Sequence, residues 1–293
     1  MAGRILVANN GLDELTVLDA ETLAVVAEVP VGGAPMIPAL TPDGRLLLVS
    51  NTATNDVSVL DAVSLRCVTS VPVEKGAAGL AIPAGGHIVY VGNEFSDSVS
   101  LLDLATLRIV RTLPVGEGPC VVASSPDGSL VVTSNEVTGD LSIIDTRTLE
   151  VRRSGRILTA PIGLGFSRDG GELLVADYLS NAVAVVETRT WTRVHELAVG
   201  TRHVGLAVTR DGREAWISNA DGDSVSVLDI ATRRHVAEIP CGDSPIYIAM
   251  SRDGRRAAVA NTGANSLTVV DVASRTPIRT VEVGISPLGV AFG

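Results

Sequence analysis

The sequence predicts an all-β protein, a seven-bladed β-propeller with four antiparallel strands in each blade. Two observations support this fold class. A unit of 42 residues recurs seven times along the 293-residue chain, which consists of almost nothing else. Within each unit, short apolar runs alternate with turns rich in Asp, Gly, Asn and Pro, a pattern typical of short strands joined by tight turns. No segment carries a sustained helical period.

The second unit shows how each unit is built. Its four strands are predicted at Met36–Leu40, Arg45–Ser50, Asp56–Leu60 and Arg66–Val73. An Asp-Gly pair joins the first two strands as a tight turn, because glycine accepts the positive φ that such turns need. Connections this short force antiparallel neighbours, so each unit is expected to be a four-stranded meander.

One asparagine after the second strand marks the repeat most clearly. It recurs at Asn9, Asn51, Asn93, Asn135, Asn219 and Asn261, with Asp177 in the remaining unit. The meanders have two largely apolar faces, and packing them radially in a ring buries both. Pro287–Phe292 has the pattern of a first strand without partners after it, and Arg4–Ala8 that of a second strand without one before it. We therefore expect a single domain over residues 1–293, closed by one C-terminal strand that joins three N-terminal strands.

The segments Ile88–Asp103 and Val115–Gly128 carry the repeat pattern in full. A strand ending in Asn is followed by a Val-Ser-x-x-Asp strand, then by a Val-Gly-x-x-Pro link into a Pro-Asp-Gly turn. This pattern resembles the YVTN-type β-propeller repeat over the whole chain, and it lacks the Gly-His and Trp-Asp signatures of WD40 repeats. The resemblance implies the fold but little about activity, because propellers serve as scaffolds, lactonases, lyases and cyclases.

Charge and composition disfavour several classes of partner. The net charge is −10, and Lys and Arg are scattered, so neither nucleic acid nor an anionic membrane is expected as a partner. No secretory segment or membrane-spanning run is visible, which predicts a cytoplasmic location. Cys67, Cys120 and Cys241 stand in different units and different columns, so no disulfide framework is expected. The oligomeric state is left open.

Because the chain repeats, each unit serves as a control for the others. The links between units and the loops between second and third strands are expected to share one face, around the mouth of an axial channel. The strongest departure there is Arg202-His203, which replaces a small residue and, in most units, a proline. Simple surface variation in one loop is the alternative explanation.

A second group of departures follows the strand-end asparagine. Glu94, Glu136 and Tyr178 occupy this position in three consecutive units, and the next position holds Phe95, Val137 and Leu179 in place of small residues. An apolar collar beside two carboxylates would raise a pKa, as a general acid or base requires. Two ordinary surface glutamates near apolar side chains are the alternative.

Three further residues are expected to border the channel. Tyr247 stands in a column that otherwise holds glycine or an aliphatic residue, so it should narrow the channel, as should Met36. Cys120 would act as a nucleophile only if the ring brought it near His203, two blades away. His87, His195 and His235 form no metal-ligand spacing. We predict no metal or cofactor, with Mg²⁺ held by Glu94 and Glu136 as the alternative.

These residues predict an acid–base enzyme for a small organic molecule. Glu94 or Glu136 would be the base, Tyr178 and His203 proton donors or orienting groups, and Arg202 a carboxylate clamp. Substrate contacts would come from Phe95, Leu179, Tyr247, Cys120 and Met36.

By analogy with strictosidine synthase and virginiamycin B lyase, the reaction would be a Pictet–Spengler-like cyclisation or an elimination. The site lacks the His-rich, Mg²⁺-dependent character that a resemblance to the second enzyme would imply. A lactonase-like hydrolase and a non-catalytic protein-interaction scaffold are the alternatives. A scaffold has no need to concentrate Glu, Tyr, Arg and His in one sector.

Overall fold

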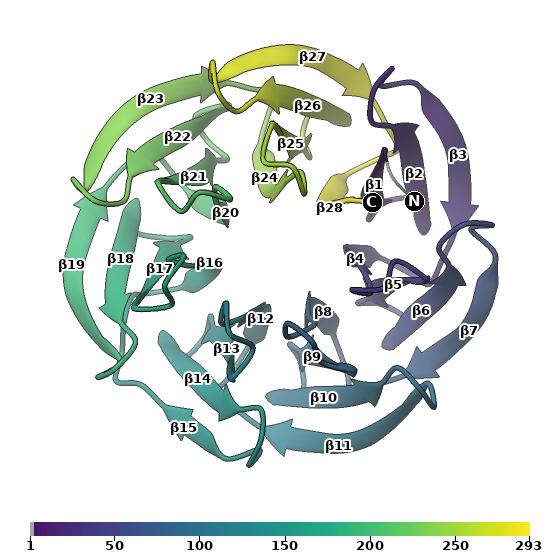
Figure 1. Ribbon diagram of the computed structural model, residues 1–293, viewed down its shortest axis with the longest axis horizontal. Coiled ribbons are helices and arrows are strands. Elements are labelled where there is room, and N and C mark those ends of the chain that lie inside the picture. The colour runs from purple at the N-terminus through teal and green to yellow at the C-terminus, as the bar shows by residue number, and fades with distance from the viewer. Residues whose placement is uncertain (1–2) are drawn as a thin grey trace.

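This computed structural model describes residues 3–293, apart from the side chain of His203. These residues form twenty-eight strands joined by turns, and they include no helix. The strands form seven antiparallel sheets of four strands each, arranged as blades around a central axis (Figure 1). The predicted all-β, seven-bladed propeller is therefore confirmed. Within the described residues, no helix is long and apolar enough to cross a lipid bilayer.

Each blade runs from an innermost strand at the axis to an outer strand at the rim. The innermost strands of blades 1 to 7 are β4 (Pro35–Leu40), β8 (Ala77–Ala81), β12 (Pro119–Ser124), β16 (Pro161–Phe166), β20 (His203–Val208), β24 (Pro245–Met250) and β28 (Pro287–Phe292). The second strands are β5 (Leu46–Asn51), β9 (Ile88–Asn93), β13 (Leu130–Asn135), β17 (Glu172–Asp177), β21 (Glu214–Asn219), β25 (Arg256–Asn261) and β1 (Arg4–Asn9).

The third and fourth strands complete the blades in the same order. The third strands are β6 (Asp56–Asp61), β10 (Ser98–Asp103), β14 (Asp140–Asp145), β18 (Ala182–Glu187), β22 (Ser224–Asp229), β26 (Ser266–Asp271) and β2 (Glu14–Asp19). The outer strands are β7 (Cys67–Pro72), β11 (Arg108–Pro114), β15 (Val151–Arg153), β19 (Thr192–Ala198), β23 (Arg234–Pro240), β27 (Thr276–Glu282) and β3 (Val25–Pro30). In the second unit, every predicted strand boundary lies within one residue of the observed one.

Blade 7 closes the ring as the sequence predicts. Its order is β28-β1-β2-β3, and the C-terminal β28 pairs antiparallel with β1, with Phe292 opposite Ile5 and Val290 opposite Val7. The yellow C-terminal strand accordingly lies beside the purple N-terminal strands in Figure 1. Opening the ring would expose both strand edges, so this pairing holds the two ends of the chain together.

The hydrophobic core lies between the blades rather than within them. One cluster combines Leu6 and Val17 of blade 7 with Leu47 and Val49 of blade 1, and all four side chains are fully buried. The core is mostly aliphatic, as the composition predicts, although Trp216 is the largest fully buried side chain. Each blade therefore depends on its two neighbours to cover its faces.

The innermost strands of neighbouring blades come extremely close together. A Cβ atom added at Gly205 would lie 2.3 Å from the carbonyl oxygen of Ile246, and one added at Gly289 would lie 2.0 Å from that of Met36. Real Cβ atoms do not approach a carbonyl oxygen this closely, so glycine is required where one blade leans on the next.

The strand-end asparagine ties the second strand to the third. Asn93 is fully buried, and its Nδ2 donates hydrogen bonds to Ser98 Oγ at 3.0 Å and to Ser100 Oγ at 2.9 Å. In blade 4 the corresponding hydroxyl positions are Ala182 and Ala184. An asparagine amide at position 177 would therefore find no hydroxyl group at these two positions to accept its hydrogen bonds.

Asp177 replaces the asparagine in that blade and reverses the direction of the bonding. Its carboxylate accepts backbone N–H bonds from Thr159 at 2.6 Å and Ala160 at 3.0 Å in the preceding link. It also accepts from Leu179 at 2.7 Å and Ser180 at 2.9 Å in the following loop. Asp177 thus replaces an amide that donates hydrogen bonds with a carboxylate that accepts them. These bonds hold the loop that carries Tyr178 in place.

The close packing of the inner strands predicts a specific sensitivity to added volume. Replacing Gly289 by Ala should destabilise the fold by about 1–3 kcal/mol, the usual cost of overpacking a core. Gly155→Ala is the matched control, because a Cβ at Gly155 meets nothing within 4 Å. Urea unfolding of both variants would measure the difference, and equal stabilities would contradict the close approach of β28 to β4.

Candidate functional site

The face that we call the top face carries the links between blades and the loops between second and third strands. Backbone hydrogen bonds join these two segments within each blade: the amide of Glu94 donates to Gly76 O at 2.8 Å, and that of Glu136 donates to Gly118 O at 2.9 Å. The amide of Tyr178 donates to Ala160 O at 2.9 Å. Equivalent bonding places these three side chains at equivalent positions on consecutive blades 2, 3 and 4.

Glu94 and Glu136 are half-buried and electrostatically coupled. Burial raises the pKa of both carboxyls, and the charge of Glu136 raises the pKa of Glu94 further. Among the described residues, neither carboxyl has a hydrogen bond or an ion pair. Two acidic groups in this arrangement favour retention of a proton or binding of a cation.

Tyr247 and Cys120 meet across the ring beside these carboxyls. Cys120 lies on β12 of blade 3 and Tyr247 on β24 of blade 6, yet the two side chains are close enough to influence each other's pKa. Burial raises the pKa of the Tyr247 phenol well above its ordinary value, and the charges of Glu94 and Glu136 act in the same direction. Part of the Tyr247 side chain remains accessible, which we attribute to its position in the axial channel. The prediction that Tyr247 narrows the channel stays a prediction.

Cys120 is held as a neutral thiol. Its side chain is only 6% exposed, and burial together with the charges of Glu94 and Glu136 raises its pKa well above the usual range. Nucleophilic attack requires the thiolate. Burial of the neutral thiol therefore disfavours the nucleophile alternative, and the substrate contact predicted for Cys120 stays a prediction.

An apolar layer fills the channel at the same level. Cys120 packs in one cluster with Ile162, Val204 and Ala220, and Met36 and Tyr178 pack against it. These residues come from blades 1, 3, 4 and 5, so the layer spans the axis. It accounts for the desolvation of the neighbouring carboxyls.

The predicted collar of Phe95, Val137 and Leu179 needs correction. Phe95 is 65% exposed and Leu179 66% exposed, so they cannot exclude water from the glutamates. The Phe95 ring lies instead against Gly76 of its own link, where an added Cβ would come within 2.8 Å of it. These side chains form an exposed apolar arc on the top-face rim.

Arg202 joins blades 4 and 5 at the rim. Its guanidinium donates to the Tyr178 hydroxyl and to Asp221 Oδ1 at 3.1 Å, and its Cζ lies 4.8 Å from the centre of the Tyr178 ring. A substrate carboxylate would have to compete with Asp221 for this group. The side chain of His203 lies outside the described residues; its backbone lies opposite Asn219 in blade 5.

No group of three or more His, Cys, Asp or Glu within the described part of the chain is arranged to hold a metal ion. The Mg²⁺ alternative would rest on Glu94 and Glu136 alone.

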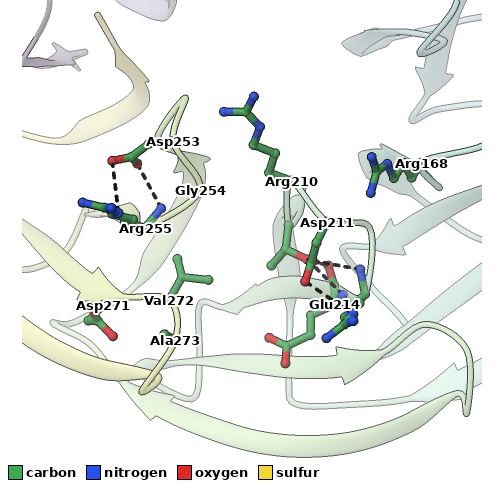
Figure 2. Close-up of a pocket in the computed structure, with 12 residues that line it drawn as sticks. Arg168, Arg210, Asp211, Glu214, Asp253, Gly254, Arg255, Asp271, Val272 and Ala273 are labelled. Atoms are coloured by element: carbon green, nitrogen blue, oxygen red, sulfur yellow. Dashed lines mark hydrogen bonds and ion pairs between the residues drawn. The ribbon is translucent and has the colours of Figure 1, made fainter.

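A second feature, not predicted from the sequence, lies on the opposite, bottom face, where the Asp-Gly turns lie. A cavity of about 800 Å³ opens there between blades 5 and 6, lined in part by Arg168, Arg210, Arg213 and Arg255 (Figure 2). Comparison of the turn columns, used above for the top face, would have found these arginines.

The raised pKa values predict how stability responds to pH. The folded state holds these protons to a higher pH than the unfolded chain, where the Glu pKa is about 4.3. Stability linked to this difference is present below that value and is lost as pH rises through the folded-state pKa. Urea unfolding should therefore show Glu94→Gln and Glu136→Gln gaining stability relative to wild type as pH rises above about 4.3.

Glu117→Gln is the control for this measurement, because Glu117 is an exposed residue on the same face. The gain with rising pH should be larger in Glu94→Gln and Glu136→Gln than any change in Glu117→Gln. A stability difference from wild type that does not change with pH in Glu94→Gln and Glu136→Gln would contradict the burial of the two carboxyls.

Several solved structures are similar to this one. Hydrazine synthase of Kuenenia stuttgartiensis is 22% identical over 92% of this chain and 93% of that chain, with a TM-score of 0.84. A functionally unknown protein of Desulfotomaculum acetoxidans is 14% identical over 99% of both chains, with a TM-score of 0.87. A candidate 6-phosphogluconolactonase of Bacteroides fragilis is 14% identical over 99% of this chain and 98% of that chain, with a TM-score of 0.84. At these identities the similarity shows the fold alone.

No curated protein matches this sequence. A family model does match it. A family model described as YNCE-like beta-propeller matches residues 76–177 and 203–292, which is more than half of the chain. The finer resemblance to the YVTN-type repeat stays a prediction. With its repeat, its closed ring of seven blades and this match, the chain belongs to the YNCE-like β-propeller family.

Proposed function

We propose that this protein is a cofactor-independent acid–base enzyme that acts on a small organic substrate at the top-face mouth of the channel, as a cyclase or a lyase. The observation that carries the proposal is the pair Glu94 and Glu136. They are half-buried on neighbouring blades, their pKa values are raised, and neither has a cationic partner among the described residues. A carboxyl of this kind exchanges protons closer to neutral pH than an ordinary one.

The same pair indicates the charge of the substrate. A protonated amine placed between Glu94 and Glu136 would relieve their mutual repulsion and donate charge-assisted hydrogen bonds to both. The phenol of Tyr247 and the apolar layer around Cys120 would surround the rest of a small molecule. The proposed substrate class is therefore an organic amine with an apolar body.

Both reaction types use the two carboxyls in opposite protonation states. In a Pictet–Spengler-like cyclisation, an amine and an aldehyde condense with loss of water, and a carbon–carbon bond forms between the aromatic ring and the iminium carbon. One carboxyl would protonate the hydroxyl of the amine–aldehyde adduct so that it leaves as water, and the other carboxylate would remove the ring proton. In an elimination, one would remove a proton and the other would protonate the leaving group. Tyr178, which accepts a hydrogen bond from Arg202, would orient the substrate at the rim.

A protein-interaction scaffold is the second candidate. The observation that favours it is the exposed apolar arc of Phe95, Val137 and Leu179 on three consecutive blades. Exposed apolar groups that gather on one face commonly mark a docking surface.

Ligand binding with matched probes tests the proposal. Phenethylamine and phenethyl alcohol have nearly the same shape but differ in charge, and the amine should raise the unfolding temperature while the alcohol does not. At a hundred times its dissociation constant a ligand adds about 2.7 kcal/mol of stability. The effect should be lost in Glu94→Gln and Glu136→Gln and retained in Glu117→Gln.

Turnover would be tested by mass spectrometry of mixtures of an arylethylamine and an aldehyde. Removing a general acid or base typically lowers the rate by about 10²–10⁴-fold, and at least one of the two Gln variants should show such a loss. Equal binding of amine and alcohol, or equal loss in Glu117→Gln, would contradict the proposal. Binding of a protein through the Phe95 arc, without binding of any amine, would favour the scaffold instead.

A further inference from the structure

The bottom-face cavity between blades 5 and 6 is far from the proposed catalytic mouth and has a different chemistry. It holds about 800 Å³ and lies among the turns that join the first and second strands. Figure 2 shows Arg210 between Arg168 of blade 4 on one side and Arg255 of blade 6 on the other. The whole protein carries a net charge of −10, so a gathering of arginines is unexpected from composition.

The repeat shows that the fold does not require these arginines. The second residue of the turn is Pro42, Ala84, Pro126, Arg168, Arg210 and Arg252 in blades 1 to 6. In each full turn the glycine amide bonds back to the first residue, as Gly44 N does to Thr41 O and Gly212 N to Thr209 O, both at 2.8 Å. Proline suits this second position because its φ is already set. In blades 4, 5 and 6, arginine therefore stands at a turn position that proline would suit better.

Arg168 and Arg210 also lie close to the corresponding turn of the next blade. An added Cβ at Gly212 would lie 2.5 Å from Arg168 Cβ, and one at Gly254 would lie 3.1 Å from Arg210 Cβ. Each arginine thus begins directly above the glycine of the following turn. Successive side chains are placed along one arc of the bottom face.

Four acidic groups line the cavity beside the four arginines, and each of them already has a partner. Asp253 accepts from Ser251 Oγ at 2.7 Å, and Asp271 accepts from Ser274 Oγ at 2.7 Å. Asp211 Oδ1 accepts from Thr209 Oγ1 at 2.7 Å and from the amide of Arg213 at 3.1 Å. Glu214 is paired with Arg275, outside the turn. The acids therefore serve mainly to hold the turns and the blade edge together.

The arginines, by contrast, lack strong partners. Within the described residues Arg168 has no ion pair or hydrogen bond, and Arg210 donates only to the backbone oxygen of Arg252. Arg213 and Arg255 approach their own turn aspartates at 3.7 and 4.0 Å with side chains 83% and 84% exposed. Exposed pairs of this kind contribute little stability, so these guanidinium groups are free to bind another anion.

We propose that this cavity binds a small polyanion that carries two or more phosphate or carboxylate groups. The planar guanidinium forms paired hydrogen bonds with such groups, and arginines from three blades would contact different groups of one ligand. The volume is in the range of small-molecule sites, and a concave site among turns suits a small ligand better than an extended protein segment. The proposal is independent of the reaction at the top face.

Calorimetric titration with tripolyphosphate at low salt tests this inference. Saturable binding to wild type is expected, and it should weaken about tenfold or more in Arg210→Ala and in Arg255→Ala, as loss of a charge-assisted hydrogen bond predicts. Citrate in place of tripolyphosphate would show whether carboxylates serve as well as phosphates. Amine binding at the top face should be unchanged in both variants, which separates this site from the proposed active site.

Arg45→Ala is the matched control. Arg45 occupies the same turn position in blade 1, and its 4.0 Å approach to Asp43 and 85% exposed side chain match those of Arg255. The Arg45→Ala substitution removes the same charge, but Arg45 lies outside the cavity. Tripolyphosphate should therefore bind this variant as tightly as it binds the wild-type protein. An equal loss in Arg45→Ala, or no saturable binding to wild type, would overturn the proposal. So would binding of an acidic peptide such as hexaglutamate without binding of tripolyphosphate.

Discussion

The close packing of seven inner strands around one axis is the constraint on which the rest of the structure depends. Neighbouring blades approach until a Cβ has no room, so glycine is required at positions such as Gly163, Gly205 and Gly289. This contact lets each blade bury both faces against its neighbours. It also leaves a narrow axial space, which the second residues of the inner strands fill with an apolar layer.

That apolar layer gives the top-face mouth its chemistry. A glutamate at a loop of a wide, wet channel would keep an ordinary pKa, because water would solvate its charge. Here Glu94 and Glu136 lie beside packed aliphatic groups and the phenol of Tyr247, and burial raises their pKa values. Each carboxyl stands on its own blade, held by the same loop-to-link hydrogen bond. A rigid scaffold thus holds two acidic groups together at a cost in solvation that a bound cation would offset.

Most of the fold could be predicted because its determinants are local and repeated. Asp-Gly turns, apolar runs and the 42-residue period define the blades, and the unpaired strand patterns at Arg4–Ala8 and Pro287–Phe292 define the closure. The sector of Glu94, Glu136 and Tyr178 was visible as departures from repeat columns. The meeting of Tyr247 with Cys120 was not, because it depends on side-chain directions across the axis. The exposure of Phe95 was missed for a similar reason, since its ring covers Gly76 and does not turn inward.

We propose that Glu94 and Glu136 form one proton-holding pair at the channel mouth. Infrared difference spectroscopy of protein with ¹³C-labelled glutamate carboxyls measures their protonation directly. We expect a carboxylic-acid band that persists above the ordinary Glu pKa of about 4.3. It should be lost in the double variant Glu94→Gln/Glu136→Gln, and a bound amine should shift its titration to lower pH. An unchanged band in the double variant, or the absence of any carboxylic-acid band above the ordinary pKa range, would contradict a shared proton on Glu94 and Glu136.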